Sequence, residues 1–115
     1  MLVVATIGSY GVYASEGAAE AQNEWQRALD AYSAKNYAEA KASFEKVASM
    51  GYATADLYYN LGNTYFKLGQ QHERPYAEGE LGRAILNYRR ALRLDPTMED
   101  ARYNLDIARD YTNDT

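Results

Sequence analysis

The chain has 115 residues, no cysteine, one histidine and a net charge of −4. A chain of this length forms one domain and can bury about two thirds of its unfolded surface. The lack of cysteine excludes disulfides, thiol catalysis and thiolate metal sites. The negative charge argues against a general affinity for nucleic acid or anionic lipid, and no apolar run approaches the ~20 residues that span a bilayer.

The first fourteen residues carry no charged side chain. Residues 2–7 form an apolar run, and Val12-Tyr13-Ala14 before Ser15 resembles a cleavage site. Together they match the C-terminal part of a secretory signal peptide, whose basic N-terminal region is missing here. We therefore interpret residues 1–14 as a signal-peptide remnant, with a disordered tail as the alternative. The first interpretation predicts an exported, periplasmic protein, whereas the second predicts a cytoplasmic one.

Apolar residues at helical spacing predict a first helix over about 16–34 and a second helix that begins near Tyr37. Gly51 is well placed as the glycine that follows the end of the second helix. The two apolar stripes consist of Trp25, Ala28, Leu29 and Tyr32, and of Tyr37, Ala40, Phe44, Val47 and Ala48.

Thr54 is a suitable N-cap for a third helix, which we expect to end at Gly69. Residues 71–80 then form an insertion before the fourth helix. We interpret this insertion as a mobile loop, because Gly79 and Gly82 disfavour a rigid helix. The alternative is a fourth helix that is lengthened at its start, with Pro75 at its first position.

The fourth helix should stop at Asp95-Pro96, because proline cannot continue a helix. Thr97 is then expected to cap a fifth helix, with Asp100 as the acid of a capping box. The fifth helix has no partner helix after it, so we expect it to cover the open end of the two helix pairs. The alternative is that the chain is a fragment and this helix opens a third pair. Asp106 and Arg109 favour the capping role, because a further repeat would have small and aromatic residues there.

The helix pairs repeat at a fixed offset. Ala28 lies 34 residues before Gly62, and 34 residues is the period of the tetratricopeptide repeat (TPR). Because Gly62 lacks a side chain, a neighbouring helix can come close to it. The TPR pattern W-x2-L-G-x2-Y…A-x3-F…P is matched by Tyr58, Leu61, Gly62, Tyr65, Ala84, Tyr88, Ala91 and Pro96.

The chain thus resembles a TPR protein. This resemblance implies an all-α fold, a right-handed stack of antiparallel helix pairs with two pairs and a capping fifth helix. The TPR domain is expected over residues 15–112. Its first repeat covers 21–54, its second repeat covers 55–98 with the insertion 71–80, and its capping helix covers 98–112.

In TPR stacks the first helix of each pair lines a concave groove, so the resemblance assigns partner binding to the first, third and fifth helices. Aromatic rings supply apolar contact area, and asparagines can both donate to and accept from a peptide backbone. Packing of the rings within the stack is the alternative. The predicted groove residues are Trp25, Leu29, Tyr32, Asp56, Tyr59, Asn60, Asn63, Phe66, Lys67, Tyr103 and Asn104.

Catalytic residues are not indicated. His72 has no second metal ligand at suitable spacing, and Glu73, Glu78 and Glu80 accompany no nucleophile. We therefore expect no enzyme activity, no metal and no cofactor.

Arginines at positions 83, 89, 90 and 93 make the fourth helix basic. We interpret them as a solvated face whose last arginines complement the helix dipole. A patch for an anionic partner is the alternative.

The chain resembles one family of TPR proteins in particular. Residues 57–68, 81–96 and 101–105 are similar to the TPR protein of Bat aerotolerance operons, the BatE type. This resemblance implies an exported, envelope-associated protein that works beside Bat proteins with von Willebrand A domains. Such proteins usually continue into membrane segments and an SH3-like domain, so we expect this chain to be a fragment or a short form.

The predicted function is a non-enzymatic scaffold that binds a peptide or protein segment in the concave groove, within a Bat complex of the cell envelope. The alternative is self-assembly, in which the fifth helix stacks on a second copy and produces a homo-oligomer. Nucleic-acid partners are not expected.

Overall fold

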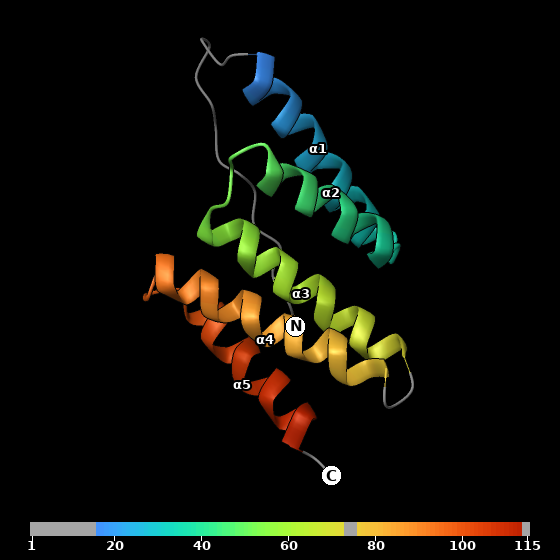
Figure 1. Cartoon of the computed structure of the whole chain (residues 1–115), viewed down its shortest axis with the longest axis vertical. Coiled ribbons are helices and arrows are strands. Elements are labelled where there is room, and N and C mark those ends of the chain that lie inside the picture. The colour runs from blue at the N-terminus through green and yellow to red at the C-terminus, as the bar shows by residue number, and fades with distance from the viewer. Residues whose placement is uncertain (1–15, 73–75, 114–115) are drawn as a thin grey trace.

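The computed structural model describes residues 16–72 and 76–113, which form five helices (Figure 1). The helices follow one another along the longest axis, with α1 near one end, α3 in the middle and α5 at the other end (Figure 1). Each helix packs on the next, and α3 also contacts α5. The elements are α1 (Glu16–Ser33), α2 (Tyr37–Ser49), α3 (Ala55–Gln71), α4 (Tyr76–Leu94) and α5 (Glu99–Asn113).

Both helices of the first pair end in the same type of turn. After α1, the N–H groups of Lys35 and Asn36 donate to carbonyls of the last turn at 3.0 and 2.8 Å. After α2, those of Gly51 and Tyr52 do so at 3.0 and 3.3 Å. These are Schellman caps, with a left-handed residue at Lys35 (φ 64°) and at Gly51 (φ 96°). The predicted role of Gly51 is confirmed.

The second pair is longer than predicted. Thr54 caps α3 as expected, because its hydroxyl oxygen accepts a hydrogen bond from the N–H of Leu57 at 3.1 Å. However, α3 continues past Gly69 to Gln71, and α4 already begins at Tyr76. The prediction of a loop over 71–80 is therefore wrong for residues 71 and 76–80, whereas Pro75 lies outside the described residues.

The extended helix forms despite its glycines. Gly79 and Gly82 both lie inside α4, where each costs roughly 1 kcal/mol relative to alanine. The opposing contribution comes from α3, because α3 and α4 share the most extensive helix contact among the described residues. Leu81 is buried between the two glycines in sequence, so burial of the lengthened helix outweighs the local glycine preference.

Asp95 holds the turn between α4 and α5. Helix α4 ends at Leu94, as the following proline predicts. The Asp95 carboxylate accepts hydrogen bonds from the N–H of Thr97 at 3.0 Å and from its hydroxyl at 2.6 Å. These bonds hold the pKa of Asp95 below its usual value. The predicted N-cap at Thr97 is wrong, because its hydroxyl binds Asp95 and α5 begins only at Glu99.

The two helix pairs have equivalent aromatic contacts. The rings of Trp25 and Phe44 meet edge to face, with centroids 5.3 Å apart. The rings of Tyr59 and Tyr88 meet at 6.2 Å. Tyr59 lies 34 residues after Trp25, so the same contact recurs in each repeat. The fold is therefore an all-α stack of helix pairs, as predicted.

Helix α5 packs on α4 and also contacts α3. Its inward stripe, Ala101, Leu105 and Ala108, is buried as expected. On its outer side, the Arg109 guanidinium lies 3.8 Å from the Asp106 carboxylate, and both side chains are exposed. The capping role of this helix stays a prediction.

Candidate partner-binding face

The predicted groove residues differ widely in exposure. Leu29, Tyr32, Asp56 and Lys67 are half-buried, and Tyr103 is 61% exposed. The remaining six are buried within the structure: Trp25, Tyr59, Asn60, Asn63, Phe66 and Asn104.

Asn63 joins the three last helices through its side-chain oxygen. This atom accepts a hydrogen bond from the hydroxyl of Tyr88 on α4 at 2.7 Å. It also accepts one from the amide of Asn104 on α5 at 3.1 Å. The same Asn104 amide donates to the hydroxyl of Tyr59 at 3.3 Å. Asn63 and Asn104 therefore have a structural role, because together they tie α3 to its two neighbours.

Tyr32 lies on the α1 side of this hydrogen-bonded network. Its ring meets that of Tyr37 at 5.2 Å. Burial raises its pKa, and the neighbouring hydroxyls of Tyr37 and Tyr59 raise it further. Burial also raises the pKa of Tyr88, with Tyr32 and Tyr59 as additional causes. Three predicted groove residues, Tyr32, Asn63 and Asn104, thus lie close to Tyr59.

Three polar atoms of α1 are buried without a hydrogen-bond partner. They are Oε1 of Gln22, Nε1 of Trp25 and the hydroxyl of Tyr32. Their spacing of three and seven residues places them on one face of the helix. Buried polar groups nearly always have a partner, so these three atoms are among the exceptions in the described part of the chain.

Charged groups lie at other positions of the same helices. Burial raises the pKa of Asp56, near the start of α3, and the nearby Asp95 raises it further. Lys67 is half-buried near the other end of α3. Beside it, the ring of Phe66 meets that of Tyr111 edge to face at 5.1 Å.

Tyr88 and Tyr111 are the residues that sequence reasoning did not assign to this face. Tyr88 stands where the TPR pattern has phenylalanine. A hydroxyl at a fully buried position needs a hydrogen-bond partner. A tyrosine at this position therefore indicates, from the sequence alone, that polar residues lie opposite it. Tyr111 had no comparable signal, because it lies beyond the matched pattern.

Neither a metal site nor a membrane span is found in residues 16–72 and 76–113. Within these ranges, no three His, Asp or Glu residues gather as metal ligands would. No helix there has the length and apolar character needed to cross a bilayer. His72 is exposed at the C-terminal end of α3.

Stacked helix pairs with repeated contacts define a helical-repeat scaffold. One family model, described as TPR repeat, matches residues 75–107, and another, described as Tetratricopeptide repeat, matches residues 55–74. These matches support a TPR protein with a TPR-like fold. TPR repeats indicate a protein–protein interaction module and are typically non-enzymatic. No curated protein and no solved structure matches the chain significantly.

Proposed function

We propose that this chain is a non-enzymatic TPR scaffold that holds a segment of a partner protein along α1, α3 and α5. The observation that carries the proposal is that Tyr32, Asp56, Lys67 and Tyr103, which the TPR resemblance assigns to the groove, keep part of their surface exposed. The aromatic rings can supply apolar contact area to a partner segment. The side chains of Asp56 and Lys67 can accept from and donate to its backbone.

The energetic reason is the burial of apolar surface. A bound segment would cover the partly exposed rings of Tyr32 and Tyr103. Each Å² of apolar surface removed from water contributes roughly 25 cal/mol. Because only a short segment fits, we expect a dissociation constant on the order of micromolar.

The cellular setting is part of the proposal. The resemblance of residues 57–68, 81–96 and 101–105 to the BatE type supports an exported protein in an aerotolerance complex of the envelope. Bat proteins with von Willebrand A domains are then the proposed partners. Mixing the purified chain with such a domain, encoded beside it in the genome, tests this setting. No complex on gel filtration at roughly ten times the expected micromolar Kd would count against it.

Site-directed photocrosslinking tests the binding face itself. A benzophenone amino acid replaces Tyr103, which is 61% exposed on α5. The matched control carries it at Ala42, an exposed residue of α2, which has no predicted groove residue. We expect a discrete protein adduct from position 103 and none from position 42. Equal adducts from both positions, or no adduct from position 103, would refute groove binding.

A further inference from the structure

One side of α4 carries positive charge for which no ion pair is found among the described residues. Residues 81–94 contain four arginines and no aspartate or glutamate. All four arginines are exposed. The ion pairs among the described residues involve Arg27, Lys46 and Arg109 instead. The exposed α4 face, as we call it here, consists of Arg83, Leu86, Arg89, Arg90, Arg93 and Leu94.

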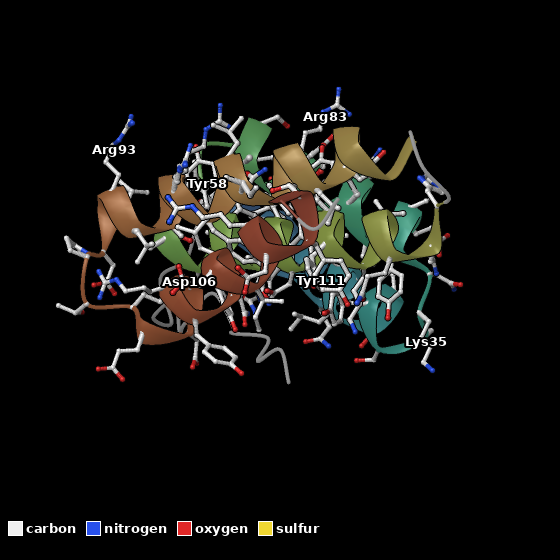
Figure 2. The ribbon with its side chains drawn as sticks, turned by 90° about the horizontal axis from the view of Figure 1, so that it is seen from below. Lys35, Tyr58, Arg83, Arg93, Asp106 and Tyr111 are labelled. Carbon is white, nitrogen blue, oxygen red and sulfur yellow. The ribbon has the colours of Figure 1, made fainter. Side chains whose placement is uncertain are left out.

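Helical geometry places these side chains together. With 3.6 residues per turn, they occupy less than half of the helix circumference. In Figure 2, Arg83, in the middle part of α4, and Arg93, near its C-terminal end, extend outward on the same side, away from Asp106 and Tyr111. Ten residues separate these two arginines, so the face extends for about 15 Å along the helix.

Two of the arginines are positioned by rings of α3. The Arg83 guanidinium lies 6.0 Å from the centroid of the Tyr65 ring. That of Arg90 lies 5.7 Å from the centroid of the Tyr58 ring. Such cation–π contacts restrain the guanidinium groups while their N–H donors remain accessible to a carboxylate.

Apolar side chains are interleaved with the charges. Leu86 is 45% exposed and Leu94 is 56% exposed, and both belong to the exposed α4 face. Eight residues separate them, so they lie about 12 Å apart along the helix. This alternation of arginine and leucine complements a segment in which carboxylates alternate with apolar residues.

We propose that the exposed α4 face binds an acidic amphipathic helix of a partner protein. Charge complementarity to the four exposed arginines favours an acidic occupant, and binding to anionic vesicles is tested as the competing outcome. The proposed site differs from the face of α1, α3 and α5, so each site can be tested separately.

The probe is a fluorescein-labelled peptide of Ala, Leu and Glu, about 18 residues long because shorter helices are marginal in water. Its glutamates line one face beside its leucines, and a control peptide has Gln in place of Glu. Fluorescence anisotropy measures binding to the full chain. We expect saturable binding of the Glu peptide and binding at least about tenfold weaker for the Gln peptide. Raising the salt from about 0.05 to about 0.3 M should weaken the former.

The variant for this test is Arg89→Gln/Arg93→Gln, because neither arginine has a cation–π contact with a described residue. We expect a loss of affinity of about threefold to tenfold, as two exposed charges can provide. Arg109→Gln on α5 is the matched control and should bind the Glu peptide like the unaltered chain. Circular dichroism verifies that each variant is folded.

Three outcomes overturn the proposal: unchanged binding by the double variant, equal binding of both peptides, or no saturable binding. Binding to vesicles of phosphatidylglycerol and phosphatidylcholine without binding of the Glu peptide also overturns it and assigns the face to a membrane. The photocrosslink from position 103 should be retained in the double variant. Loss of peptide binding alone therefore leaves the proposed groove function intact.

Discussion

The ring of Tyr88 lies directly against the backbone of Gly62. A Cβ atom on Gly62 would stand 2.6 Å from both Cδ1 and Cε1 of that ring. Tyr88 is fully buried and cannot move aside without losing its hydrogen bond to Asn63. The contact explains why α3 has a glycine in its interior, where alanine would otherwise favour the helix.

Gly62→Ala should therefore destabilise the protein. Overpacking of this kind costs typically about 1–3 kcal/mol, which exceeds the roughly 1 kcal/mol that alanine gains in a helix. Gly82→Ala is the matched control, because nothing lies within 4 Å of its added Cβ. Urea unfolding should show a loss for the first variant and a gain of about 0.5–1 kcal/mol for the second. A gain in both would contradict the close contact.

The hydrogen bond between Tyr88 and Asn63 should appear as a coupling energy. Tyr88→Phe removes one donor and should cost about 1 kcal/mol. Asn63→Ala leaves both the Tyr88 hydroxyl and the Asn104 amide without this acceptor, so it should cost about 2–4 kcal/mol. The double variant should be less destabilised than the sum, by at least about 0.5 kcal/mol. Strict additivity would show that the bond does not form in solution.

Lys35 should be replaceable by glycine with a gain in stability. Its φ of 64° lies in the left-handed region, which costs a residue with a Cβ roughly 1 kcal/mol relative to glycine. Lys35→Gly should raise the free energy of unfolding by about 0.5–1 kcal/mol. Gly51→Ala, at the equivalent cap with φ 96°, should lower it by a similar amount or more. Both changes are measured by thermal and urea unfolding.

Glu24 should make the stability depend on pH in the acid range. A hydrogen bond from Ser43 is the main cause that lowers its pKa, and the charges of Lys46 and Arg27 assist against the opposing effect of burial. Because the folded pKa lies below the usual value of 4.5, this stabilisation is complete above about pH 4.5. It is lost as the pH falls through the lowered pKa.

Glu24→Gln isolates this contribution from those of the other acids. The urea midpoint of the unaltered chain should exceed that of the variant near pH 6, and the difference should shrink below pH 4.5. A difference that stays constant down to about pH 3 would show that the Glu24 carboxylate has its ordinary pKa.

Local signals predicted most of the helix ends. Gly51 and Thr54 have the residue types that their turns require, and the proline after Asp95 cannot continue α4. Thr97 failed as a predicted cap because Asp95, two residues earlier, competes for the same hydroxyl. Lys35 could not be found, since lysine is not typical of the left-handed position that it occupies.

Contacts between helices could be predicted only in part. The 34-residue offset placed Gly62 in a tight helix contact, but it did not show that Tyr88 is the opposing residue. For the same reason, Asn63 and Asn104 were predicted to face a partner, although they bind each other across α3 and α5. The glycines of α4 suggested a loop, because the low helix propensity of glycine takes no account of the burial of α4 against α3.

The indole N–H of Trp25 provides the most direct test of the proposed binding face. Trp25 is the only tryptophan, so it gives a single indole signal in a ¹H–¹⁵N spectrum. Trp25 lies on α1 one turn before Leu29, so a segment bound along this helix should alter the surroundings of the indole. Titration with the segment captured at position 103 should shift this signal. A signal that stays in place while the segment binds would contradict the proposal.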